Sequence, residues 1–210
     1  MNSNIRKSGI TLLIVVLCMC SARVDAALSP KEQAYYDNYQ SILQVMKKAM
    51  DNAPKTGDPT LDFLYEMIPH HEAAVSMAEN IAKYGSNERV KQLALTIIKE
   101  QLKGIGEMET LLNKLKKNPQ IDVTKEQAYL KGYNEAYKQM IAAMQNAKPT
   151  GNIDRDFLKE MIPHHEGAVA MARNILNYTD NAELKAIAER IVASQQKQIA
   201  EMKDLLKTIK

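Results

Sequence analysis

Two short stretches combine histidine with methionine, which are the side chains of this sequence best suited to hold a soft metal ion. The sequence MIPHHE occupies residues 67–72 and recurs at residues 161–166, and the two copies hold all four histidines of the chain. Thioether sulfur is a soft neutral ligand that suits Cu(I), and imidazole suits copper in both oxidation states. The motif therefore predicts copper binding, with Ag(I) as a chemical mimic.

The rest of the chain repeats with the same offset of 94 residues, which indicates a tandem duplication. Aliphatic positions have diverged, as Leu93 and its counterpart Ile187 show, because core positions exchange readily among similar aliphatics. The methionines have not been exchanged in either copy, so sulfur itself is predicted to matter. The predicted metal ligands are Met46, Met50, Met67, His70, His71, Met77 and Met108 in the first copy, and Met140, Met144, Met161, His164, His165, Met171 and Met202 in the second.

Helical spacing determines which of these side chains can cooperate. Met67, Ala74 and Met77 fall on one stripe of a helix together with one of the two histidines, leaving a small residue in the middle. Adjacent helical residues point about 100° apart, so both histidines reach one ion only if the proline before them distorts the helix. The glutamates that follow, Glu72 and Glu166, are expected to face solvent.

The chain reads as all helical, with short connections that favour antiparallel bundles. Ser29-Pro30-Lys31-Glu32 has the spacing of a capping box and predicts a helix start. The expected helices lie at residues 30–52, 60–84 and 87–117, and in the second copy at 124–147, 153–178 and 181–209. Each motif helix is expected to kink or break at Pro69 or Pro163. The expected domains are a first repeat at 27–120 and a second at 121–210.

The first 26 residues predict a secretory signal peptide, with a basic start, an apolar run and cleavage after Ala26. The protein is thus expected in the periplasm or secreted, with no membrane attachment after cleavage. Both cysteines lie in this segment, so the mature chain has neither disulfides nor thiolate ligands. The whole sequence has 28 basic and 25 acidic residues, and the mature chain keeps 25 and 24 of them. This balance gives no reason to expect a nucleic-acid partner.

Other chemistries fit the residues less well. A di-iron bundle needs inward glutamates and Glu-x-x-His pairs, and zinc catalysis normally needs three His or carboxylate ligands. Three alternatives stay open: non-covalent haem binding by His and Met, an enzyme using bound copper or iron, and a metal-free module whose methionine faces grip partner helices. The sequence therefore predicts copper binding without catalysis.

The two motifs also resemble a bacterial family of periplasmic copper-binding proteins, first catalogued as a domain of unknown function and typified by the CopM-type copper-resistance proteins. The resemblance rests on the residues from Asp62 through the Met-Ile-Pro-His-His run to Ala78, with Met108 on the next helix, and on the same pattern in the second copy. It implies a ferritin-like or four-helix-bundle fold and binding of Cu(I), silver and, at the histidines, Cu(II). The implied role is copper buffering, trafficking or resistance, with a copper efflux or acceptor protein as candidate partner.

One difference between the copies lies in the third helix of each. Gly104 and Gly106 in the first copy correspond to Gln198 and Ala200 in the second. The glycines are expected to loosen the first copy near Met108 and to weaken its site.

Overall fold

The computed structural model describes residues 27–209 as an all-α bundle of six helices. The predicted signal peptide at residues 1–26 lies outside the described residues. The helices are α1 (Pro30–Asp51), α2 (Pro59–Tyr84), α3 (Glu88–Leu115), α4 (Val123–Gln145), α5 (Ile153–Ile175) and α6 (Ala182–Thr208). The expected all-helical fold is therefore confirmed, and each predicted repeat contributes three helices.

Local sequence signals place the helix ends where they were expected. At the start of α1, the backbone N–H of Ser29 donates to the Glu32 carboxylate at 2.7 Å, and the Glu32 N–H donates to the Ser29 hydroxyl at 3.3 Å. This is the predicted capping box. Helices α2 and α5 run without a break through Pro69 and Pro163. The prolines therefore do not divide the motif helices. Of the two expected alternatives, the break at each proline is wrong.

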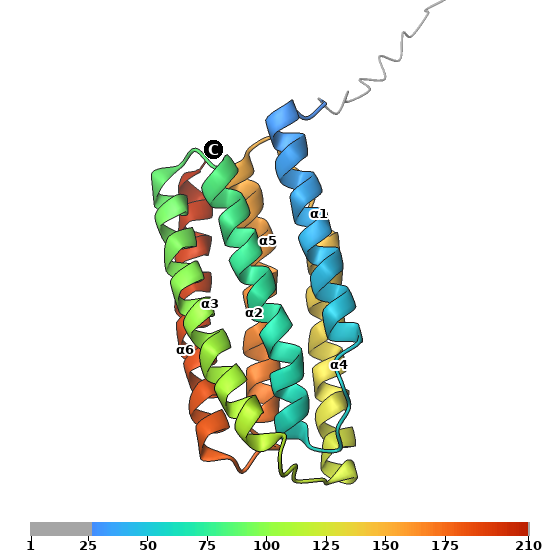
Figure 1. Cartoon of the computed structure of the whole chain (residues 1–210). Helices are drawn as coiled ribbons and strands as arrows, with labels where there is room; N and C mark the ends of the chain where they lie inside the picture. The colour runs from blue at the N-terminus through green and yellow to red at the C-terminus, as the bar shows by residue number, and fades with distance from the viewer. Residues whose placement is uncertain (1–26, 210) are drawn as a thin grey trace, which may run out of the picture.

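The six helices form three pairs, each with one member from either half of the chain (Figure 1). Helices α2 and α5 lie at the centre, α1 and α4 on one side, and α3 and α6 on the other. In every pair the two helices run in opposite directions. Buried residues from all six helices belong to one hydrophobic cluster, so the two predicted repeats share a single core.

Equivalent residues make reciprocal contacts across this core. The Tyr35 hydroxyl donates to Glu160 at 2.5 Å, and Tyr129, its counterpart at an offset of 94, donates to Glu66 at 2.5 Å. Such reciprocal contacts between equivalent residues are typical of a two-fold symmetric interface, which here forms within one chain. Burial raises the pKa of Glu66 to about 7 and that of Glu160 to about 8. Both carboxyl groups are thus buried where the halves meet.

Candidate metal centre

His70 on α2 and His164 on α5 meet at the pseudo-two-fold axis in the middle of the bundle. Both are fully buried, and their ring centroids are 3.7 Å apart with the planes tilted by 31°. His164 Nε2 lies 3.1 Å from the backbone carbonyl oxygen of His70. Since a carbonyl only accepts, this nitrogen carries the proton and Nδ1 of His164 keeps its lone pair. That Nδ1 atom, like Nδ1 of His70, is buried without a partner among residues 27–209.

A methionine from the other half of the chain completes this contact. Nε2 of His70 lies 3.2 Å from Sδ of Met140, on α4. Two ligands that share a tetrahedral metal ion with bonds of about 2.0 and 2.3 Å stand roughly 3.5 Å apart. The nitrogen and the sulfur are therefore within a few tenths of an ångström of the separation that a shared ion requires. Because a thioether only accepts, Nε2 of His70 carries the proton in this contact, and an ion shared with the sulfur requires the tautomer with the proton on Nδ1.

Gly167 makes room for this methionine. A Cβ atom at that position would lie 2.4 Å from Sδ of Met140 and 2.6 Å from its Cγ. The counterpart of Gly167 in the first half is Ala73. Because a side chain at residue 167 would displace the sulfur, the glycine allows Met140 to lie against His70.

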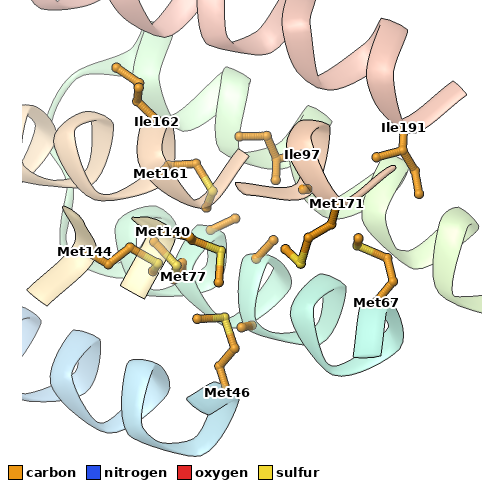
Figure 2. Packing of buried hydrophobic residues seen from close by; sticks show 14 of the residues in the cluster. Met46, Met67, Met77, Ile97, Met140, Met144, Met161, Ile162, Met171 and Ile191 are labelled. Carbon is orange, nitrogen blue, oxygen red and sulfur yellow. The ribbon is translucent and has the colours of Figure 1, made fainter. Parts of the chain in front are cut away.

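The other predicted methionine ligands belong to the same buried core. All ten are buried, at 2% exposure or less. Figure 2 shows side chains from α1, α2, α4 and α5, among them Met46, Met77, Met140 and Met161, pointing toward one another between the helices. Met67, Met144 and Met171 are drawn in the same view, and Met50, Met108 and Met202 belong to the same buried cluster. The structure thus gathers sulfur from both halves, and the assignment of each methionine as a ligand stays a prediction.

The second histidine of each pair points away from the centre. The rings of His70 and His71 have centroids 6.1 Å apart. Nδ1 of His71 donates to the Met67 carbonyl at 3.1 Å, so its Nε2 holds the lone pair and faces α3. There Gly104 leaves the ring uncovered, since a Cβ atom on it would lie 3.2 Å from Cδ2 of His71. The two histidines of each pair therefore face different surroundings.

His165 has a different neighbour on α6. Its Nε2 lies 2.6 Å from the amide oxygen of Gln198, and the Gln198 amide nitrogen donates to Glu100 at 2.9 Å. Helix α3 is continuous through both glycines. Gly104 also contacts His71, and the expected loosening of α3 near Met108 stays a prediction. Gln198 was not predicted as a partner of His165, although its difference from Gly104 was visible in the sequence.

Burial keeps all four imidazoles neutral. Burial is the largest cause that lowers the pKa of each histidine, to about 3 for His71 and about 4 for His165. For His70 and His164 the pKa lies well below its usual value, and the other histidines add to the effect. A neutral imidazole has a lone pair available for a metal ion.

The exposure of the glutamates in the motif helices was predicted only in part. Glu72 and Glu166 are exposed as expected, and Glu166 pairs with Lys203 at 2.7 Å. The buried Glu66 and Glu160 were not singled out, although each recurs at an offset of 94. Among residues 27–209, no three His, Cys, Asp or Glu side chains are grouped to hold a metal ion, so the donors at the centre are imidazole and thioether. Within the same residues no helix has the length and apolarity to cross a membrane.

Comparison with known sequences places the chain in a family. Residues 60–206 match the profile of DUF305, described only as a domain of unknown function. The chain belongs to the DUF305 family. The resemblance to CopM-type proteins is thereby confirmed, while the division into two copies stays a prediction, because one match spans both motifs.

Solved structures and one curated protein are similar to this chain. CopM in a silver-bound form is 31% identical with a TM-score of 0.54, over 71% of this chain and 95% of CopM. CopM is also known in Cu(I)-bound and Cu(II)-bound forms. A DUF305 fragment from Deinococcus radiodurans is 28% identical with a TM-score of 0.55, over 74% of this chain and 100% of the fragment. Protein L153 of Acanthamoeba polyphaga mimivirus is 42% identical over 53 residues, 25% of this chain and 35% of L153.

Proposed function

We propose that this protein binds copper, mainly as Cu(I), at a centre formed between its two halves. The observation that carries the proposal is the meeting of His70, His164 and Met140, with 3.2 Å between the imidazole nitrogen and the sulfur. The centre is buried and neutral, and it lies in a core that also holds the other predicted methionine ligands. Such donors favour a soft monovalent cation over the harder divalent ions.

The similarity to CopM supports copper and silver as the ions. CopM has been crystallised with silver, with Cu(I) and with Cu(II), and it shares the fold and nearly a third of its residues with this chain. All fourteen methionines and histidines named above stay candidate ligands. Those at the contact between α2, α4 and α5 are proposed to bind first, because their donor atoms already lie close together.

The proposed role is buffering, transfer or resistance outside the cytoplasm, without catalysis. The predicted signal peptide supports export. Thioether ligands suit an oxidising compartment, since they cannot be lost to disulfide formation as thiolates can. A copper efflux or acceptor protein is the proposed destination of the ion.

The test is an anaerobic titration of the mature protein with Cu(I) against a competing chelator. Met140→Leu is expected to weaken binding more than Met46→Leu, although the two methionines are equivalent by sequence, because only Met140 has its sulfur against a histidine nitrogen. The paired variant His70→Ala with His164→Ala is expected to weaken it further. Wild-type protein that retains no copper after desalting would overturn the proposal.

A further inference from the structure

A cavity of about 230 Å³ opens between α3 and α6, apart from the central pair of histidines. His71 lines it together with Gln101 and Gln195, and Glu100, Glu107 and Arg190 stand around it. Arg190 pairs with Glu107 at 2.6 Å. Lys103 also lines the cavity and lies 3.9 Å from Glu107. Both cationic side chains of the lining are thus beside a carboxylate.

The cavity is lined by hydrogen-bond acceptors that have no donor. Gln101 and Gln195 are equivalent residues, only 3% and 2% exposed, and the amide oxygen of each has no partner among residues 27–209. Nε2 of His71 holds a lone pair, because its Nδ1 donates to the Met67 carbonyl. Buried polar atoms are rarely left unpartnered in native proteins, so a bound species is expected to satisfy these acceptors. One imidazole lone pair and two amide oxygens can accept hydrogen bonds from a donor such as water, or bind a cation.

Gly104 decides whether this cavity reaches a histidine. In the first half the glycine leaves Nε2 of His71 uncovered, 3.4 Å from where a Cβ atom would stand. In the second half Gln198 takes the equivalent position and caps His165 at 2.6 Å. Gln198 is also held by Glu100 on the neighbouring helix. The same histidine position is therefore open in one half and closed in the other.

We propose that the cavity between α3 and α6 is a second metal site, in which His71 Nε2 and the amide oxygens of Gln101 and Gln195 bind a divalent cation of the Cu(II) class. Mixed nitrogen and oxygen donors suit Cu(II), whereas the sulfur-rich centre suits Cu(I). The choice of copper rests on the proposed function, but the site shares no residue with the contact of His70, His164 and Met140. The protein would thus offer separate places to the two oxidation states.

The test measures Cu(II) binding without reductant by electron paramagnetic resonance and by titration. Gly104→Gln fills the open position while keeping all four histidines, and Gly106→Gln is its control. Gly106 lies on the same helix, and a Cβ atom there meets nothing within 4 Å. Gly104→Gln is expected to lower Cu(II) affinity by about 10- to 100-fold, the range for lost support of a metal ligand, and Gly106→Gln to leave it unchanged.

Two further variants keep the test decisive if Gly104→Gln fails to fold. His71→Gln is expected to remove the nitrogen hyperfine signal of the bound Cu(II). Gln198→Gly uncovers His165, the counterpart of His71, and is expected to raise Cu(II) affinity by offering a second imidazole. Unchanged Cu(II) binding in both Gly104→Gln and His71→Gln would overturn the inference. Cu(I) titration of the same variants separates the two proposals, because Cu(I) binding at the central pair is expected to survive in Gly104→Gln.

Discussion

The two halves of the bundle share the residues that meet at its centre and differ at several neighbouring positions. The histidines, tyrosines and glutamates that meet across the pseudo-two-fold axis are identical in both halves. Among the positions that differ around them are Lys55 and Pro149, Ala73 and Gly167, Gly104 and Gln198, and Asn38 and Gly132. The shared contacts hold the halves together, while the differing neighbours give equivalent residues different surroundings.

The largest effect on stability is expected from the reciprocal Tyr-Glu pairs. Tyr35→Phe removes the hydroxyl that donates to the buried Glu160 and is expected to lower the free energy of unfolding by about 1–3 kcal/mol. Tyr129→Phe is expected to cost less, because Glu66 keeps the ammonium group of Lys55. Urea unfolding of both variants measures the difference. Equal losses would show that Lys55 does not compensate.

The next effect concerns the position of Met140. Gly167→Ala places a Cβ atom where the sulfur now lies, an overpacking that costs about 1–3 kcal/mol and is partly offset by about 1 kcal/mol of helix propensity. The variant is also expected to weaken Cu(I) binding, because the sulfur moves from His70. Ala73→Gly is the matched control, expected to lower stability by about 1 kcal/mol with Cu(I) affinity unchanged. Full Cu(I) affinity in Gly167→Ala would separate Met140 from the site.

A smaller effect is expected at the ion pair that only the first half has. Lys55→Met leaves the buried Glu66 with the Tyr129 hydroxyl alone, as Glu160 is with Tyr35. The expected loss is about 1 kcal/mol, because the lysine side chain is 41% exposed and water screens such pairs. Thermal unfolding checks it. After this change the Tyr35→Phe and Tyr129→Phe substitutions are expected to cost the same.

The smallest effect is expected where α1 meets α2. The Asn38 amide donates to Asn80 at 3.1 Å, and its counterpart Gly132 lies so close to Asn174 that a Cβ atom would stand 2.3 Å from the Asn174 amide oxygen. Asn38→Gly is expected to cost about 0.5–1 kcal/mol. Gly132→Ala is expected to give no gain despite its better helix propensity, because Asn174 would leave the Tyr129 carbonyl that it now contacts at 2.8 Å. A stabilised Gly132→Ala variant would contradict this account.

The sequence predicted the helices and the candidate donors because these depend on local patterns. The capping box at Ser29 and the glycine and proline breaks gave the helix ends to within a few residues. The repetition at an offset of 94 singled out the methionines and histidines, all of which are buried.

The partners of these residues could not be predicted, because they depend on how α2 packs on α5. No spacing in the sequence indicates that His70 meets His164 and Met140 rather than the methionines of its own half. The buried Glu66 and Glu160 were missed for a related reason, since a glutamate within a helix is usually exposed. The contact of Gly104 with His71 could not be predicted either, because it joins two neighbouring helices.

The central claim is a copper site shared by the two halves of one chain, and locating the ion tests it most directly. Crystals of the mature protein loaded with Cu(I) or Ag(I) would show the metal by anomalous scattering. The account predicts a peak between α2, α4 and α5, within bonding distance of His70 and Met140. Peaks confined to each half, with none between His70 and Met140, would contradict it.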